Sequence, residues 1–577
     1  MTARVLLAVA VVAAALFFVG LDQPPFIDPP EGFHAAVARE MLAGGDWITP
    51  RINGVRYFDK PPLLYWLMAT GFATLGLSPA VARLASVLPA VGVAVVTAWI
   101  GLRLGGARLG LLAGLIVAAN LELFLYARLV KPDLLMVLAI VCAFAAFLEA
   151  YGVGRRGAVP LFYASLGAAA LAKDILGAIG PLLVVAVFLA VTGERAQLAQ
   201  WRPWHGLAVL AAVVLPWYGA MEIANPGFLW YTVVDNHALN IAQHRVFPDE
   251  DVPLGALEFL GVTAVGFLPW TAALPWAVWR ALRGPWDSVE RRAWLLLGMW
   301  TTLVLGVFTL SPFKLPHYGL PAFPAMALLV AKLWNDVLDG DPPAVRAMLV
   351  PALITLIAVA IAAYLGSEGR LALPGDALST VDVATRNLAA RGQDAPFATA
   401  AAIRPILGTL ALIFGAGAVA VAAALALGRL QIGLGVLLAV MLAGLPVTVQ
   451  GVAAFAESRS LRPLAEAVAL RAGPRDVLVH EGPLENSASW LLGLARGREP
   501  VRIVNGRQSN LAVGATYPEA RAIFWDGRRL AESWRGAERL FLISTLPPER
   551  SATRDLPPDS VHLLAVRGGR WLYSNRQ

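Results

Sequence analysis

Long apolar segments alternate with short polar ones through about the first 450 residues of the chain. Thirteen of these segments approach the roughly 18–20 residues that an α-helix needs to cross about 30 Å of hydrocarbon. The pattern predicts a polytopic α-helical membrane protein, with about 13 transmembrane helices within residues 1–454. The predicted spans are 5–21, 79–102, 109–127, 133–151, 157–172, 175–192, 206–223, 256–277, 293–310, 317–335, 347–365, 404–427 and 430–449.

One further apolar segment, 61–77, is expected to lie at the membrane surface. It begins with two prolines and is shorter than the other apolar segments. Tyr65 and Trp66 suit the headgroup level, where amphipathic aromatic rings are enriched. We therefore interpret it as an interfacial helix that returns the preceding polar loop, 22–62, to the bilayer.

The tail, 455–577, has the composition of a soluble domain. Short apolar runs typical of buried strands alternate with helical stretches at 487–496 and 526–536, which predicts a small α/β domain. The tail has no complete nucleotide-binding fingerprint and is assigned no catalysis, so binding or covering an acceptor stays open. The predicted strands are 477–482, 501–506, 522–526, 540–545, 562–566 and 570–575.

Composition supports a membrane protein, and charge adds an orientation. The chain is 58% hydrophobic and 15% charged, whereas about a quarter of a soluble protein is charged. Lys and Arg gather in the short loops on one side, which predicts a cytoplasmic N-terminus and extracytoplasmic long loops and tail. The net charge of +7 then reflects those basic loops, and no Arg/Lys stripe indicates a nucleic-acid partner. The long loops are 22–62, 224–255 and 366–403.

Two smaller features constrain processing and redox chemistry. The apolar run 5–21 is followed by DQPPF, with no small-residue cleavage site, so we expect an uncleaved first span rather than a signal peptide. The single cysteine, Cys142, excludes an internal disulfide and a CxxC metal site.

The first long loop carries the densest chemistry of the chain. Asp28 and Glu31 stand just before the helix-like run HAAVAREML. Acids at a helix N-terminus are stabilised by the helix dipole, so capping is one interpretation. The two prolines between them indicate a fixed, exposed turn, and we favour a catalytic role.

The same loop continues as GDWITPRINGVRYFDKPPLLYW and brings Arg56, Tyr57, Asp59 and Lys60 to the membrane surface. A lysine there can reach any lipid phosphate along its apolar stem. It can equally hold one specific phosphate as a point charge. The spacing does not separate these alternatives.

Two later motifs place charges at the outer ends of spans. Asp133 begins a span beside Arg128 and Lys131, where a helix cap and a functional carboxylate are equally compatible with the sequence. Lys173 and Asp174 lie between two apolar runs, where a loop ion pair is the simpler interpretation.

Two further outer loops supply histidines. His237 and His244 are seven residues apart, two turns along one face of an α-helix. A divalent metal there stays open, although no acid ligand is evident and no metal or other cofactor is assigned. The motif SPFKLPHYGLP contains Lys314, His317 and Tyr318 between prolines, which favours a rigid phosphate-binding turn.

These loops gather acids, lysines and histidines at one membrane face. That chemistry suits a reaction on a lipid-linked phosphate, because cations neutralise a leaving phosphate and a carboxylate orients or deprotonates an acceptor hydroxyl. A transporter or flippase of a lipid-linked substrate is the main alternative. It would favour internal repeats and ionisable groups at the bilayer midplane, which this sequence lacks. A non-catalytic assembly protein would explain the tail but not the first loop.

The motifs AREMLAGGDWITPRINGVRYFDKPPLLYW, LVKPDLLM, ALAKD, PWY…NPGF…H and SPFKLPHYGLP, in this order, resemble one family. It is the bacterial GT-C glycosyltransferases related to aminoarabinose transferase and protein O-mannosyltransferase, of the family 39/83 type. The resemblance covers about 20–335, and WLYSNR near the end of the tail is similar to the family's closing strand.

The resemblance implies an enzyme of the bacterial cytoplasmic (inner) membrane, with its active site at the outer face. The donor would be a sugar on polyprenyl phosphate, typically undecaprenyl phosphate. The acceptor would be a lipid such as lipid A, a glycan or a protein. Asp28 or Glu31 would be the catalytic acid, supported by Asp133. The substrate-binding candidates are Arg56, Tyr57, Asp59, Lys60, Lys173, His237, His244, Lys314, His317 and Tyr318, of which Lys60 and Lys314 would face the donor phosphate.

The sequence departs from the family pattern at four positions. Relatives commonly have adjacent Asp and Glu where this chain has Pro30 and Glu31, so the identity of the catalytic base is open. His34 stands where Tyr is usual, and Asp59 where Glu is frequent. Relatives often have AKG where this chain has AKD.

Overall fold

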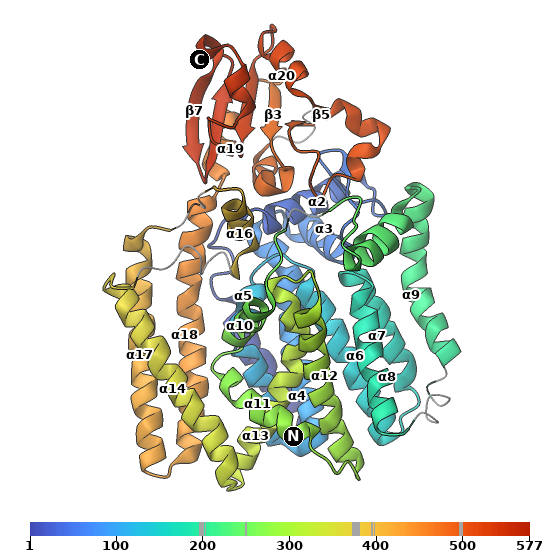
Figure 1. Cartoon of the computed structure of the whole chain (residues 1–577), viewed down its shortest axis with the longest axis vertical. Helices are drawn as coiled ribbons and strands as arrows, with labels where there is room; N and C mark the ends of the chain where they lie inside the picture. Colours follow the sequence, from blue (N-terminus) through green and yellow to red (C-terminus); the bar gives the residue numbers. More distant parts are fainter. Residues whose placement is uncertain are drawn as a thin grey trace.

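The computed structural model describes residues 1–194, 201, 203–248, 251–371, 381–393, 396, 398–494 and 500–577. A helical bundle forms most of the molecule, and a small domain with a β-sheet lies at one end of it (Figure 1). The N-terminus lies at the opposite end of the bundle from this domain (Figure 1). The longer helices of the bundle are α1 (Thr2–Phe18), α4 (Pro79–Ala118), α6 (Asp133–Val153), α7 (Ala158–Ala172), α8 (Leu176–Val191), α9 (Pro203–Ala224), α12 (Val289–Leu310), α13 (Phe323–Leu338), α14 (Pro342–Ser367), α17 (Ala400–Ala426) and α18 (Leu430–Arg459).

The chain is a multi-span membrane protein, but the predicted number of 13 spans is not confirmed. Seven helices of the described part are long and apolar enough to cross a bilayer. They become eight if the bent pair α10 (Ala256–Gly266) and Trp270–Leu282, which contains α11 (Leu274–Leu282), forms one span; the helix direction bends by 110° between its two parts. Several predicted spans fold as shorter apolar helices, including α1, α7 and α8.

Helix α4 is counted as one span because of its length, although it covers parts of two predicted spans. Gly105 and Gly106 have non-helical backbone angles inside it, and φ of Gly106 is +80°. The two arms then pack closely, since a Cβ on Gly101 would lie 2.9 Å from the Cα of Gly110. Only glycines permit this tight turn and close approach. The predicted segments 79–102 and 109–127 therefore correspond to two arms of one helical hairpin, which α5 (Leu121–Ala127) extends.

The first loop folds as a platform between the bundle and the small domain. It contains α2 (Pro30–Gly44), the two-stranded hairpin of β1 (Arg51–Ile52) and β2 (Val55–Arg56), and then α3 (Leu63–Leu75). Figure 1 shows α2 and α3 directly beneath the small domain. At 13 residues α3 is too short to span, as predicted for the 61–77 segment.

The C-terminal domain is α/β, and all six predicted strands form. The sheet order is β5-β4-β3-β6-β8-β7, with β5, β4, β3 and β6 parallel and the β7–β8 hairpin antiparallel. The strands are β3 (Val477–Glu481), β4 (Arg502–Val504), β5 (Phe524–Trp525), β6 (Leu540–Ser544), β7 (His562–Arg567) and β8 (Arg570–Ser574). The helices are α19 (Arg462–Arg471), η5 (Leu484–Gly493) and α20 (Gly527–Trp534).

The domain docks on the first loop. The segment η5 follows β3 and packs on α2, so the carboxyl ends of the parallel strands face the bundle. The short helix α16 (Val383–Ala390) lies beside the same edge (Figure 1). Because α18 continues to Arg459, the predicted boundary at 454 falls within a helix.

Candidate functional site

Asp133 is the centre of a buried charge cluster. It is the first residue of α6, and its Oδ1 lies 2.7 Å from Lys173 Nζ and 3.5 Å from His317 Nε2. Lys173 follows the last residue of α7, and His317 belongs to η4 (Pro316–Ala322). The structure therefore joins three predicted site residues from three separate segments. Tyr318 closes one side, with its ring centre 4.9 Å from Lys173 Nζ.

Lysines and a neutral histidine surround this cluster. Lys131, two residues before Asp133, places its Nζ 5.3 Å from the Tyr126 ring centre, and burial lowers its pKa. Burial also lowers the pKa of His34 to about 3, with smaller contributions from Lys60 and Lys131, so His34 is neutral at pH 7. The His34 Nδ1 lies 2.8 Å from Tyr65 Oη. Lys131 was not among the predicted binding residues, although its place beside Asp133 was a usable signal.

Asp59 is bound by a tyrosine from a later segment of the chain. Tyr231, in the π-helix η2 (Trp230–Leu239), donates a hydrogen bond from its hydroxyl to the Asp59 carboxylate. Lys60 Nζ donates to the Asp59 carbonyl oxygen at 3.3 Å. Tyr57 is buried near Asp59, and burial raises the pKa of its hydroxyl well above the ordinary value.

An apolar groove leads to the Asp133 cluster. Side chains of α6, α8 and α12 form its walls, and Lys173, Asp174, His317 and Tyr318 form its polar end. Its volume is about 980 Å³, including the open space at its mouth. An apolar channel with a lysine among the polar groups at its end matches a long hydrocarbon chain that carries one anionic group. The apolar wall includes Met136, Ile140, Phe144, Trp300, Val304 and Phe308.

Glu31 is fully engaged in an ion pair. Its Oε1 accepts from Arg83 Nε at 2.9 Å and from the Val130 N–H at 3.2 Å, and its Oε2 accepts from Arg83 Nη2 at 2.6 Å and from the Ile27 N–H at 3.0 Å. Arg83 also donates to three carbonyl oxygens of the 21–25 segment. Neither side chain is more than 2% exposed. This geometry favours a brace of the first loop over a proton acceptor.

Asp28 faces the C-terminal domain. Its carboxylate accepts hydrogen bonds from the Ser489 N–H at 3.0 and 3.2 Å and from the Ser489 hydroxyl. Burial raises the pKa of Asp28 to about 7, against the opposing effects of Ser489 and Arg570. Asp133 was predicted to support Asp28 or Glu31, and that role stays a prediction, since no hydrogen bond or ion pair joins Asp133 to either residue.

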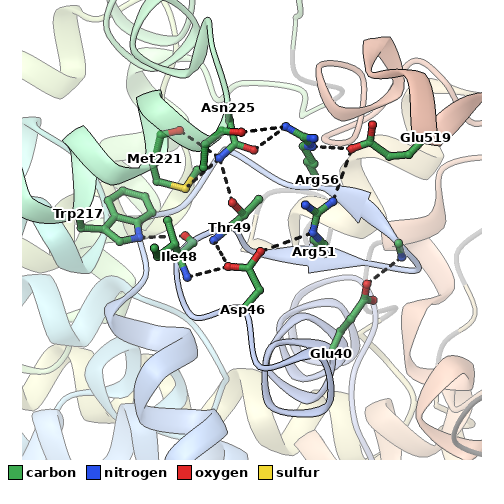
Figure 2. A network of polar contacts seen from close by, with 12 residues as sticks. Glu40, Asp46, Ile48, Thr49, Arg51, Arg56, Trp217, Met221, Asn225 and Glu519 are labelled. Atoms are coloured by element: carbon green, nitrogen blue, oxygen red, sulfur yellow. Dashed lines mark hydrogen bonds and ion pairs between the residues drawn. The ribbon is translucent and has the colours of Figure 1, made fainter.

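Arg56 lies in a network that joins the first loop to the C-terminal domain (Figure 2). Its Nε donates to Glu519 Oε1 at 2.5 Å, and its Nη1 donates to Asn225 Oδ1 at 2.9 Å. Asn225 in turn donates to Thr49 Oγ1 at 2.9 Å. The Tyr517 ring centre lies 4.1 Å from the Arg56 guanidinium carbon. These contacts give Arg56 a docking role, and its predicted contact with substrate stays a prediction.

The predicted pairing of His237 and His244 is not formed as the spacing suggested. His237 lies in η2, whose π-helical turn breaks the 3.6-residue period, and its Nδ1 is 2.5 Å from the Thr232 carbonyl oxygen. His244 follows Gln243, whose φ is +58°, and is exposed beyond the helix end. Within the described ranges, no group of three or more His, Cys, Asp or Glu side chains is placed to hold a metal.

Lys314 is also held by its own loop. It is buried, and its Nζ donates to the Ser311 carbonyl oxygen at 2.6 Å, while its carbonyl oxygen accepts from the Leu254 N–H at 2.9 Å. These bonds fix the turn that presents His317 and Tyr318 to the groove.

The fold is that of the GT-C class of membrane glycosyltransferases. The crystal structure of ArnT from Cupriavidus metallidurans bound to undecaprenyl phosphate matches it over 99% of this chain and 97% of that chain, with a TM-score of 0.80 and 23% sequence identity. Residues 30–232 match the model of the dolichyl-phosphate-mannose-protein mannosyltransferase family.

Sequence similarity to curated proteins also points to membrane glycosyltransferases. The chain is similar to undecaprenyl phosphate-alpha-4-amino-4-deoxy-L-arabinose arabinosyl transferases of Aeromonas hydrophila (30% identity over 60% of this chain and 64% of the relative) and Sodalis glossinidius (32% over 60% and 63%). It thus spans a little under two thirds of the length of these relatives. These similarities confirm the family resemblance that the motifs predicted.

Proposed function

We propose that the chain is an integral-membrane glycosyltransferase that moves a sugar from a polyprenyl-phosphate donor to an acceptor at the extracytoplasmic face. The observation that carries this proposal is the apolar groove that ends at Lys173 and His317, both of which contact Asp133. The groove suits the polyprenyl chain, and Lys173 at its end, with Lys131 nearby, suits the donor phosphate. The names of the curated relatives make 4-amino-4-deoxy-L-arabinose on undecaprenyl phosphate the first donor to test.

In the proposed reaction the acceptor hydroxyl attacks the anomeric carbon of the donor sugar. The bond between that carbon and the phosphate oxygen breaks, and polyprenyl phosphate leaves with the electron pair. Lys131 and Lys173 stabilise the negative charge that develops on the phosphate. Asp133 orients Lys173 and His317 toward that phosphate, because its Oδ1 lies next to both. The acceptor's proton passes to a carboxylate of the first loop.

The carboxylates of the first loop differ in their availability for that proton. Glu31 has four hydrogen bonds from protein donors, and Asp28 is bound to Ser489. Asp59 has one hydroxyl donor, Tyr231, and lies beside Lys60. We place Asp59 first among the candidate proton acceptors, ahead of Asp28 and Glu31.

The acceptor and the orientation follow from the same proposal. An acceptor that is itself a lipid, such as lipid A, reaches a site at the membrane surface most directly; a glycan or a protein would have to approach from the extracytoplasmic side. The gathering of Lys and Arg in the short loops supports an extracytoplasmic C-terminal domain. The compartment is then the bacterial cytoplasmic membrane.

The test is sugar transfer by the full chain in liposomes, with radiolabelled polyprenyl-phosphate sugars and a membrane extract as the acceptor pool. We expect Asp133→Asn to lower transfer by about 100-fold or more, the loss typical of an electrostatic group at a transition state. The matched control is Asp526→Asn, at an exposed acid outside the groove that caps α20 by accepting a hydrogen bond from the Arg529 N–H.

Two results would overturn the proposal. One is equal transfer by wild type and Asp133→Asn. The other is no transfer with any donor, together with movement of labelled lipid to the opposite leaflet, which would establish a flippase.

A further inference from the structure

A second polar cavity lies between the C-terminal domain and the bundle, away from the Asp133 groove. It opens at the edge of the sheet where the parallel strands end, beside the first loop and α16. It is small, with about 20 Å³ open to the centre of a water-sized sphere, and none of its lining residues lines the groove. Its polar walls include Asp28, Asn387, Arg391, Arg459, Thr545 and Arg570.

Three arginines from different segments meet at this cavity. Arg391 follows the last residue of α16, Arg459 ends α18 and Arg570 begins β8. The carboxylate of Asp382 balances Arg459, at 2.9 Å from its Nη1. The C-terminal domain and α16 are also joined directly, because Arg550 Nη1 donates to the Arg391 carbonyl oxygen at 2.7 Å. The arginines are therefore held in place by the fold and not by one flexible loop.

Arg570 is a half-buried cation with neutral partners. Its Nε donates to Ser487 Oγ at 3.1 Å, and its Nη1 and Nη2 donate to carbonyl oxygens of Gly568 and Asn486 at 2.8 and 2.5 Å. Across the described ranges, no carboxylate forms an ion pair with it within 4.0 Å. Burial lowers its pKa to about 10, so it remains charged. Charges removed from water are normally paired, so this one has room for an anion.

Asp28 does not neutralise that charge at neutral pH. It lines the cavity and attracts Arg570, but its carboxylate is occupied by Ser489. Burial keeps a large share of it protonated near pH 7. Within the described residues, the cavity lining therefore offers Arg570 no fully ionised acid near pH 7.

We propose that this cavity is an oxyanion site that binds a phosphate group, with Arg570 and Arg391 as its cationic contacts. Ligands of open α/β sheets bind at the carboxyl ends of the parallel strands, and this cavity lies at such an edge. Arginine pairs with phosphate through parallel N–H donors, which a lysine does not reproduce. Asn387 and Thr545 add neutral polar groups to the wall.

The proposal is tested by binding, independently of sugar transfer. The full chain in detergent is titrated with inorganic phosphate, and the thermal midpoint and calorimetric heat are recorded. We expect saturable binding that Arg570→Gln weakens by about tenfold or more, since a hydrogen bond to a charged group contributes about 1.5–3 kcal/mol. The matched control is Arg567→Gln, on the same hairpin but exposed and outside the cavity, which keeps wild-type affinity.

A second variant should change phosphate affinity in the opposite direction. Asp28→Asn removes the only acid lining the cavity within the described residues, so it should raise phosphate affinity above wild type at pH 8. The Asp28→Asn measurement still tests the proposal if Arg570→Gln does not fold. The thermal midpoint of Arg570→Gln without phosphate shows whether that variant folds. The proposal fails if wild type shows no saturable phosphate binding, if Arg567→Gln loses as much affinity as Arg570→Gln, or if Asp28→Asn lowers affinity.

Competition identifies the source of the phosphate group. Short-chain phosphatidic acid, a soluble phosphomonoester lipid, is added against bound inorganic phosphate. Displacement at lower concentration than free phosphate supports a lipid-borne group at this site. Displacement only by inorganic phosphate supports a site for the free ion.

Discussion

Arg83 and Glu31 form a two-bonded ion pair between a helix of the bundle and the start of the first loop. The pair is buried, with side-chain exposures of 2% and 0%, and Arg83 also binds three carbonyl oxygens of the 21–25 segment. One arginine thus gathers the chain between α1 and α2. This arrangement assigns to Glu31 the task of holding the loop, where the family resemblance implied catalysis.

Substituting Glu31 should therefore destabilise the protein as much as it affects transfer. Glu31→Gln leaves Arg83 buried without its carboxylate, which typically costs about 3–5 kcal/mol. We expect a lower thermal midpoint in detergent, and Arg83→Met should lower it similarly. The exposed pair of Arg462 and Glu466 supplies the control, since Arg462→Met should leave the midpoint unchanged. A Glu31→Gln variant with wild-type stability and no transfer would instead make Glu31 the catalytic base.

Sequence reasoning located much of this fold because the relevant signals are local. The six strands of the C-terminal domain follow from short apolar runs between turns, and each one forms. The helices were predictable from the length of the apolar segments. The number of spans was not, and Gly105 and Gly106 show why. A glycine pair inside an apolar run is compatible with a continuous helix and with a hairpin, and only packing of the two arms decides.

The site residues could be predicted one by one because each motif is a local sequence signal. Their contacts with each other could not, because these depend on the fold. Asp133, Lys173 and His317 were each chosen from their own motifs, yet no spacing showed that Asp133 would bind both others. Arg83 was missed although it carried a signal: an arginine inside an apolar run has a buried partner. The roles of Arg56 and Asp28 depend on contacts with a domain more than 400 residues later in the chain.

Lys131 should contribute mainly to binding of the donor. It lies two residues before Asp133, and its pKa is lowered by burial, so a phosphate that enters the site restores a counter-charge. Lys131→Met should raise the KM for the polyprenyl-phosphate sugar by about tenfold or more. Lys332→Met, at the far end of the bundle and paired with Asp336, serves as the control. An unchanged KM with lower kcat would move Lys131 from binding to the transition state.

Asp28 gives the junction between the first loop and the C-terminal domain a pH dependence. Its folded pKa of about 7 exceeds the ordinary 3.8, so the folded state holds the proton more tightly than the unfolded state. Stability from this group is therefore greatest at low pH and falls as pH rises from about 4 through 7, by up to about 4 kcal/mol. The charged groups that act on it are Arg570, which favours ionisation, and Glu31, which opposes it.

The difference between wild type and Asp28→Asn isolates this effect from other carboxylates. Thermal midpoints at pH 5 and pH 8 should fall more steeply for wild type than for Asp28→Asn. Parallel falls would show that Asp28 is ionised throughout, and that Ser489 compensates for its burial.

Gly32 should be the most sensitive glycine of the first loop, because α2 and η5 approach most closely there. A Cβ at this position would lie 2.5 Å from the Ser489 backbone nitrogen and 2.2 Å from Asp28 Oδ1. The new methyl group would clash with the Ser489 backbone on one side and with the hydrogen-bonded Asp28 carboxylate on the other, so it could not move away from both. Gly32→Ala should therefore push the C-terminal domain off α2, at a cost of about 1–3 kcal/mol or more.

Gly44→Ala provides a control within the same helix. Gly44 ends α2, and a Cβ there would meet no atom within 4 Å. Alanine is also the better helix former, so this variant should keep or slightly raise the thermal midpoint. If docking of the C-terminal domain supports the first loop in catalysis, Gly32→Ala should lower sugar transfer together with the midpoint, while Gly44→Ala retains both. Normal transfer by a destabilised Gly32→Ala protein would show that the loop holds its catalytic geometry without the domain.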